Sequence, residues 1–308
     1  MRLKNLVPVI GLLLLVYILY RIGIQSIVKS LFEVNYLLLI PYLILFIPML
    51  AMQTGKWNYI MKKQKIKFKF NYLLKLQIIS TFYELVTPAR IGSLIKINYI
   101  NQKIKNFGRS ASSVVIDRFL DFLIVALLGF VGSISLIQDN RSIFWSSLIV
   151  LFLFLLGFFI MINEKLNRMI FGIGYKMLIP KSMKDKAERS ITQFYKSIPK
   201  LKYIIYLAIM TFIFWIIAYT QAYILAIAFN ISIPYKDFIL LFPISVIVSL
   251  LPISISGFGT REASLLVVLS KFNLNQGNIV AFSISWIAIP LIIYTLISLP
   301  LIFRKKVK

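Results

Sequence analysis

Residues 238–270 read FILLFPISVIVSLLPISISGFGTREASLLVVLS, an apolar stretch long enough to cross a membrane but interrupted in its middle. The interruption runs from Pro252 to Glu262. Pro252 cannot donate a helix hydrogen bond, and Gly257 and Gly259 allow tight turns and close backbone approach. Non-helical backbone at membrane depth must be buried in protein or line a wet cavity, because lipid cannot satisfy its hydrogen bonds. The stretch therefore predicts a broken membrane helix.

A second apolar stretch, residues 72–100, is interrupted in the same way by the sequence TPARIG at 87–92, where Pro88 and Gly92 are the breaking residues. Six uninterrupted apolar segments surround the two broken stretches, at about 3–21, 36–54, 112–136, 143–162, 203–229 and 279–303. Of the 308 residues, 59% are hydrophobic and 15% are charged, whereas soluble domains carry about a quarter charged residues. We therefore predict one all-α polytopic membrane domain over residues 1–308.

Lysine and arginine are distributed unevenly between the connecting segments. Of the 35, 27 lie in segments 1–5, 53–75, 96–110, 163–202 and 304–308, and five lie in segments 21–35, 139–142, 230–237 and 271–278. Positive residues concentrate on the cytoplasmic side of a membrane. All 27 fall on that side if each broken stretch returns to the face from which it entered.

This charge pattern predicts a topology. We expect about six crossing helices and two re-entrant helical hairpins, at about 72–100 and 238–270, that enter from opposite faces. Both termini would then be cytoplasmic, in the cell (plasma or inner) membrane. Two hairpins of this kind can meet near the midplane, as the broken helices of secondary transporters do. The alternative, two kinked helices that each cross once, would leave Lys103, Lys105 and Arg109 outside.

The composition excludes several classes of function. Cysteine and histidine are both absent, which removes disulfides, thiolate nucleophiles, a histidine base and the usual zinc sites. The sequence has no phosphate-binding loop of the G-x-x-x-x-G-K-[S/T] type. The net charge of +25 follows from cytoplasmic lysines and arginines and does not require nucleic acid. We expect no cofactor, no metal site and no catalytic residue.

Charged side chains within the apolar stretches are the candidates for function, because each costs about 2.5–3.5 kcal/mol to insert at the bilayer centre. They are Glu84, Arg90, Asp117, Arg118, Asp121, Arg261 and Glu262. Asp117 and Asp121 are four residues apart and share one helix face, so a cation is expected opposite them. Arg90 and Arg261 are the predicted partners. Arg118 points away from Asp117 and either pairs with Glu84 or extends to the membrane surface.

Two interpretations of these charges remain open. In the first, they are structural ion pairs that join the hairpins to the bundle. In the second, they bind a lipid headgroup, because guanidinium groups hold phosphate through two parallel hydrogen bonds. Half-helix N-termini beside the breaks, such as the one beginning near Ala263, would add positive dipole ends.

Three motifs resemble those of a known family. The segments 87–92 (TPARIG), 115–121 (VIDRFLD) and 251–262 (LPISISGFGTRE) are similar, in order and spacing, to the signature segments of the flippase-like membrane domain family. This family includes the transmembrane region of phosphatidylglycerol lysyltransferase (lysylphosphatidylglycerol synthase). The third segment is the most specific. Ser93 stands where the family usually has Glu, and Asp117 stands where Glu is frequent.

The resemblance implies a stand-alone member that lacks the soluble transferase domain. Its expected function is translocation of an anionic phospholipid or a lipid-linked sugar between leaflets through a polar midplane cavity. The alternatives are a membrane subunit or intramembrane enzyme of lipid-linked glycosyl transfer, with Glu84, Asp117, Asp121 and Glu262 as acids or bases, and an ion-coupled solute transporter. The basic segments 56–75 and 163–202 are expected to lie at the cytoplasmic interface, where each basic residue gains about 1 kcal/mol from anionic lipid.

Overall fold

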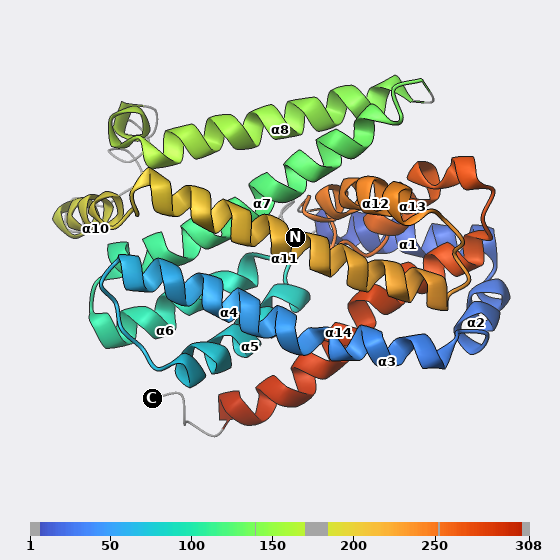
Figure 1. Ribbon diagram of the computed structural model, residues 1–308, viewed down its shortest axis with the longest axis horizontal. Coiled ribbons are helices and arrows are strands. Elements are labelled where there is room, and N and C mark those ends of the chain that lie inside the picture. The colour runs from blue at the N-terminus through green and yellow to red at the C-terminus, as the bar shows by residue number, and fades with distance from the viewer. Residues whose placement is uncertain (1–6, 139, 170–183, 252, 304–308) are drawn as a thin grey trace.

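The computed structural model describes residues 7–138, 140–169, 184–251 and 253–303. Throughout these residues the backbone forms helices and turns, with an isolated β-bridge between two loops (Figure 1). The helices are α1 (Val7–Ile22), α2 (Ile24–Phe32), α3 (Tyr36–Ile44), α4 (Phe46–Lys63), α5 (Phe70–Val86), η2 (Ile91–Leu94), α6 (Ile95–Ile104), α7 (Phe107–Ile134), α8 (Arg141–Ile162), α10 (Lys184–Lys196), α11 (Leu201–Ala228), α12 (Tyr235–Ser249), α13 (Thr260–Val268), η4 (Ser270–Phe272) and α14 (Gln276–Phe303).

The chain is an all-α polytopic membrane protein, as predicted. Among the described residues, four helices are long and apolar enough to cross a membrane: α3 and α4 together, α8, α11 and α14. The pair α1 and α2 also passes this test but bends by 84° at Gly23. Helix α7 has 28 residues, a length of roughly 42 Å against a hydrocarbon core of about 30 Å. It carries the aspartate-containing motif at 115–121.

One connection differs from the expectation. Residues 21–35 were expected to be a connecting segment, but 24–32 form helix α2. Ile27 and Ser30 are buried on one face of this helix, and the Ser30 hydroxyl donates to the Asn278 side chain on α14 at 2.7 Å. One face of α2 therefore packs on the protein, in a segment too short and too polar to read as a span, while Ile24, Val28 and Phe32 remain exposed.

The first break follows α5. Thr87 is extended (φ −115°, ψ 146°) because the residue before proline avoids the helical region. Arg90 then turns left-handed at φ 56°, and the chain continues through η2 into α6, which packs back against α5. A β-carbon on Gly92 would lie 2.1 Å from the Tyr83 carbonyl oxygen. Gly92 is therefore required for this return.

The second break separates α12 from α13, which pack against each other. Gly257 and Gly259 both have φ 83°, a conformation that glycine adopts without strain. A β-carbon on Gly259 would lie 2.0 Å from the Gly11 carbonyl oxygen of α1. Pro252, predicted to break this helix, lies outside the described residues. Both broken stretches thus consist of two helices that contact each other.

The two breaks meet each other. Pro88 and Ile255 form an antiparallel β-bridge, and the Ser256 hydroxyl donates to the Leu85 carbonyl oxygen. The backbone N–H of Gly11 on α1 donates to the Ile253 carbonyl at 3.1 Å. Backbone groups that the helices release at membrane depth are therefore paired across the junction, which is the condition for such segments in lipid.

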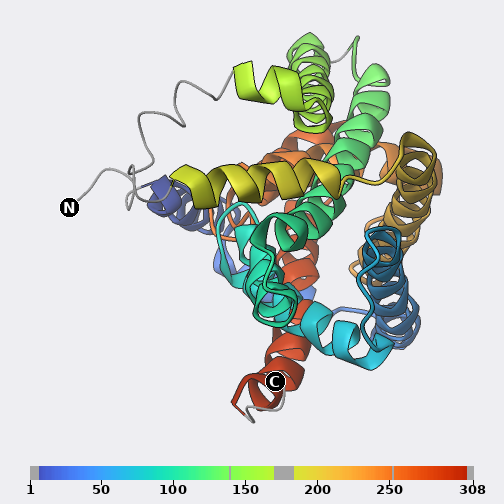
Figure 2. The same ribbon diagram turned by 90° about the vertical axis from the view of Figure 1, so that its left-hand side faces the viewer.

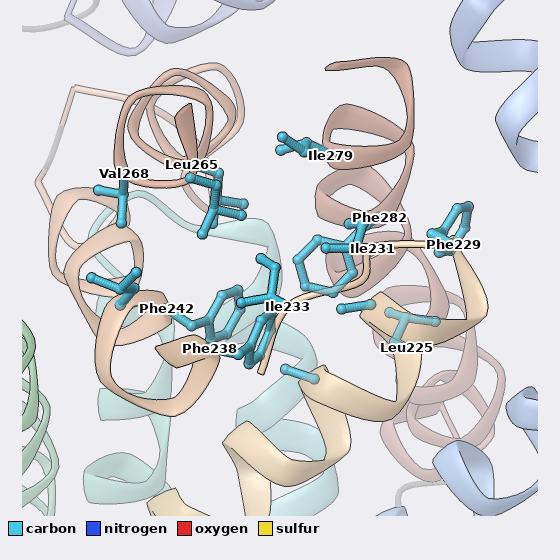
Figure 3. Close-up of a cluster of buried hydrophobic side chains, with 14 of the residues drawn as sticks. Leu225, Phe229, Ile231, Ile233, Phe238, Phe242, Leu265, Val268, Ile279 and Phe282 are labelled. Carbon is cyan, nitrogen blue, oxygen red and sulfur yellow. The ribbon is translucent and has the colours of Figure 1, made fainter. Parts of the chain in front are cut away.

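Aromatic and aliphatic side chains hold α12 and α13 in place (Figure 3). Phe238 and Phe242 of α12 stack at 5.0 Å between ring centroids, and Phe282 of α14 packs 5.7 Å from Phe242. Leu265 and Val268 of α13 belong to the same buried cluster.

Helix α8 packs on α7 at the edge of the bundle (Figures 1 and 2). Its outer face exposes residues such as Trp145, Ile149, Phe152 and Phe159.

The first break yields a test of stability. Gly92→Ala places a methyl group against the backbone of α5, and we expect it to lower the free energy of unfolding by about 1–3 kcal/mol. Gly55→Ala, within α4, meets no atom within 4 Å and should be neutral or slightly stabilising. Thermal unfolding of the purified protein in detergent compares the two variants. Equal melting temperatures would contradict the close approach at Gly92.

Candidate functional site

Two aspartates on α7 are held by a buried lysine. The Lys56 ammonium on α4 lies 3.0 Å from Asp117 Oδ1 and 2.5 Å from Asp121 Oδ1. All three side chains are almost fully buried. The expectation that Asp117 and Asp121 share one helix face is confirmed, but the expected partners, Arg90 and Arg261, are wrong. A lysine from the neighbouring helix occupies the position between the carboxylates, and α4 packs directly on α7.

A second buried lysine supports Asp117 from the other side. Lys96, at the start of α6, lies 3.6 Å from Asp117 Oδ2 and donates to the Gln77 side-chain oxygen at 2.8 Å. Its ammonium also lies 4.4 Å from the centroid of the Trp57 ring, within range of a cation–π interaction. Every face of this cation therefore meets a carboxylate, an amide oxygen or an aromatic ring.

Neither lysine was predicted as a site residue from the sequence. Lys56 and Lys96 stand at the ends of basic segments and were counted with the cytoplasmic surface, yet they are 1% and 0% exposed. For Lys56 the available signal was its position inside helix α4, next to Trp57 and before Ile60, which are also buried. A lysine among buried residues needs a carboxylate partner.

Arg118 connects the aspartates to the first break. It lies 3.4 Å from Asp117, 3.2 Å from Asp121 and 2.9 Å from Glu84. The pairing of Arg118 with Glu84, one of two possibilities considered from the sequence, is therefore confirmed. Glu84 also lies 3.8 Å from Arg90, so the ion pairs run from α4 through α7 and α5 to the break itself.

These side chains form one electrostatic unit, which we call the charged cluster. It contains four cations and three carboxylates, listed as Lys56, Arg90, Lys96, Arg118, Glu84, Asp117 and Asp121. With every group ionised, the charged cluster has one positive charge in excess. Arg90 lies at the end of the charged cluster and makes its longest ion pair, to Glu84. The Arg90 side chain is also the most exposed in the cluster, at 19%.

A cavity of about 130 Å³ opens beside the charged cluster. Glu84, Arg90, Arg118 and Asp121 line its polar part. Its other part includes six aromatic side chains from α3, α4, α11 and α14, namely Tyr42, Phe46, Phe214, Trp215, Trp286 and Tyr294. This volume is smaller than the roughly 300–1,000 Å³ of drug-sized sites. The cavity is therefore suited to a small polar group and not to a whole lipid.

Arg261 and Glu262 form a separate network in the second break. Arg261 Nη2 lies 3.1 Å from Glu262 Oε1, and Arg261 Nε donates to the Ser283 hydroxyl at 2.8 Å. That hydroxyl donates to Glu262 at 2.6 Å, and the other Glu262 oxygen accepts the backbone N–H of Gly259 at 2.6 Å. Glu262 thus caps the N-terminus of α13, which begins at Thr260 and not near Ala263. Neither side chain lines the cavity described above.

The predicted site residues are therefore divided between two places. Glu84, Arg90 and Asp121 reach the cavity, and Asp117 lies behind them in the charged cluster. Pro88, Gly92, Gly257 and Gly259 shape the two breaks that meet beside it. Arg261 remains within electrostatic range of Arg90 and of Tyr42, so the two networks are neighbours even though no ion pair joins their described atoms.

The basic surface segments are partly as expected. Lys62 and Lys63 are exposed at the end of α4, and Lys63 lies over the rings of Tyr59 and Tyr203. Helix α10 carries four basic residues, a strongly polar face and an apolar edge. It packs on the start of α7, where a β-carbon on Gly108 would meet the Ser190 carbonyl oxygen. Residues 170–183 of the expected segment 163–202 lie outside the described residues.

Two comparisons with known proteins agree with the fold. Residues 6–298 match the family described as the lysylphosphatidylglycerol synthase TM region. A relative, the UPF0104 membrane protein MJ1595 of Methanocaldococcus jannaschii, is 25% identical over 306 residues, and the match covers 88% of this chain and 85% of the relative. Together with its long apolar helices, these similarities make the chain a multi-pass membrane protein.

The buried lysine yields a second test. Lys56→Met leaves Asp117 and Asp121 without the cation between them, and breaking a buried ion pair costs about 3–5 kcal/mol. We expect a fall in melting temperature of roughly 10 °C. The double variant Lys56→Met/Asp121→Asn should lose less, because one uncompensated charge is removed. Lys62→Met, at an exposed position of the same helix, is the control, and a Lys56→Met variant as stable as this control would disprove the role of Lys56.

Proposed function

Because the chain belongs to the lysylphosphatidylglycerol synthase transmembrane-region family, we propose that it moves a lipid with an anionic headgroup between the two leaflets of a membrane. The headgroup passes through the cavity beside the charged cluster while the acyl chains stay in the surrounding lipid. The observation that carries this proposal is the location of an excess positive charge, ending at Arg90, in a cavity at the junction of two broken helices.

The electrostatics of the cavity favour an anion. Moving a phosphate headgroup into the bilayer core removes its water, and the protein has to replace those hydrogen bonds. Arg90 has one carboxylate partner, at 3.8 Å, so its guanidinium retains donors for phosphate oxygens. A bound monoanion would also balance the single excess charge of the cluster.

The remaining members of the cluster then have a supporting role. Lys56, Asp117 and Asp121 hold Arg118 toward Glu84, and Glu84 in turn restrains Arg90. A guanidinium group fixed in this way loses little conformational entropy when it binds a ligand. The long distance between Arg90 and Glu84 means that an incoming phosphate competes with a weak contact and not with a tight pair.

The broken helices provide a route for the headgroup. In this proposal the hairpins at 72–100 and 238–270 enter from opposite faces, and both termini are cytoplasmic in the cell membrane. Each hairpin would then open or close one side of the cavity, in the manner of transporters with a midplane site. Positive-φ residues Ala89, Arg90 and Ser256 lie at the contact between the breaks, where backbone strain is stored at the proposed moving part.

A transport assay tests the proposal. Purified protein is reconstituted in vesicles with a phospholipid carrying an acyl-chain fluorophore, and exchange between leaflets is followed by chemical quenching of the outer leaflet. We expect exchange well above protein-free vesicles, and a fall of at least tenfold for Arg90→Gln. Arg168→Gln, at an exposed arginine paired with Glu164, is the control that should leave the rate unchanged.

Two results would contradict this function. Exchange no faster than in protein-free vesicles would rule out unassisted translocation, and an unchanged rate in Arg90→Gln would separate the cavity from transport. The same vesicles are extracted and analysed for new lipid products, since a product would favour the intramembrane enzyme instead.

A further inference from the structure

Helix α2 has an apolar face that the rest of the described chain leaves largely uncovered. An α-helix turns by about 100° per residue, so residues spaced by three, four, seven and eight positions lie on one face. Four apolar side chains have this spacing and are 62%, 41%, 38% and 76% exposed, namely Ile24, Val28, Leu31 and Phe32. This face needs an apolar environment from outside the described chain.

A second face of the same helix is charged and open. Lys29 and Glu33, four residues apart, form an ion pair at 3.6 Å, and their side chains are 74% and 55% exposed. Gln25, one turn before Lys29 on this face, is exposed as well. Charged side chains are costly in the hydrocarbon core of a membrane, and protein does not shield this pair. The charged face of α2 therefore requires water or lipid headgroups.

The third face attaches α2 to the protein. Ile27 is 4% exposed and belongs to the main hydrophobic core, and the Ser30 hydroxyl donates to the Asn278 side chain at 2.7 Å. A β-carbon on Gly277 would lie 2.4 Å from the Ser26 hydroxyl oxygen, so α2 and the start of α14 are in close contact. These contacts fix the rotation of α2 about its own axis, with its apolar and charged faces both turned outward.

The flanking helices show at which level of the membrane α2 lies. Helix α2 is bent by 84° from α1, and it lies at the end of the bundle opposite to α6 and α10 (Figure 1). Tyr20, near the end of α1, and Tyr36, at the start of α3, are 85% and 62% exposed. Tyrosine is enriched where membrane helices reach the water interface. Both neighbours of α2 therefore carry an interfacial residue next to it.

We propose that α2 is an interfacial helix that lies in the plane of the membrane surface, on the side opposite to α6 and α10. Its apolar face inserts at the boundary between headgroups and acyl chains, and its charged face meets water. Helices with this separation of faces bind at a depth of about 5–10 Å in that boundary. The exposed apolar surface of α2 continues onto α1 at Val16 and onto α3 at Leu37, so the occupant of this face is lipid and not a soluble protein.

This contact connects the membrane surface to the interior of the protein and does not depend on lipid transport. Helix α2 is attached to the first turn of α14. Later turns of α14 carry Ser283, which binds Arg261 in the second break, and Trp286, which lines the cavity. The interfacial helix therefore anchors, at one membrane surface, the helix that reaches both sites.

Fluorescence quenching at single cysteines tests the position of α2, because the chain has no cysteine of its own. Val28→Cys, Phe32→Cys and Glu33→Cys are labelled with a small fluorophore and reconstituted in phosphatidylcholine vesicles. The quenchers are iodide on both sides of the membrane and phosphatidylcholine with a nitroxide either near the headgroup or near the end of the acyl chain. Phe152→Cys, an exposed position in the middle of α8, is the control for the bilayer core.

We expect the shallow nitroxide to quench the labels at 28 and 32 at least twofold more than the deep one, and the order to be reversed at 152. Iodide should quench the label at 33 at least threefold more than the label at 32. Stronger quenching of 28 and 32 by the deep nitroxide would make α2 part of a span and overturn the proposal. Equal iodide quenching at 32 and 33 would place the helix in water. Labels at 28 and 32 that neither quencher reaches would show that protein, such as a second copy of the chain, covers the face, and would also refute the lipid contact.

Discussion

Two interrupted helices have to satisfy their free backbone groups inside a membrane, and in this protein they do so by meeting each other. The bridge between Pro88 and Ile255 and the hydrogen bond from Ser256 to Leu85 join the breaks directly. Within the breaks, Thr87 accepts the Gly92 N–H and Glu262 accepts the Gly259 N–H. Without these contacts each break would expose unpaired polar groups to lipid, at a cost of several kcal/mol per group.

The junction also determines where charge can be buried. Arg90 and Glu84 flank the first break, and α7 brings Asp117, Arg118 and Asp121 beside them. Seven ionised groups in one apolar domain are tolerable because each cation lies within 4 Å of a carboxylate. Because four cations share three carboxylates, one positive charge is not neutralised within the cluster. This imbalance links the architecture to the proposed binding of an anion.

Much of the architecture follows from the sequence because composition and breaking residues act locally. Runs of apolar residues predicted the six long helical segments, and the glycines and prolines predicted both breaks, with Pro252 left outside the described residues. The pairing between helices was harder to predict. Positive-inside counting treats a lysine near a helix end as a surface residue, so Lys56 and Lys96 were missed. Identifying their partners requires knowing that α4 and α6 pack on α7, which is a property of tertiary structure.

The aromatic lining of the cavity shows the same limit. Tyr42 and Trp215 lie in ordinary apolar spans, where an aromatic residue usually contributes to packing. Nothing in their spacing places them at a common cavity, which forms where α3, α11 and the first break come together. Arg261, which the sequence favoured as a headgroup ligand, is instead bonded within its own break to Glu262 and Ser283.

Disulfide cross-linking between the two breaks tests the central claim most directly, because the chain contains no cysteine that would compete. Residues opposite each other in an antiparallel pair have Cα atoms about 4.5–5.5 Å apart, within the range of a disulfide. The variant Pro88→Cys/Ile255→Cys should therefore lose both free thiols on mild oxidation, whereas Pro88→Cys/Val267→Cys, with its second cysteine on an exposed face of α13, should retain them. Mass spectrometry of the intact protein after thiol blocking measures both. Equal thiol retention in the two variants would contradict the meeting of the breaks.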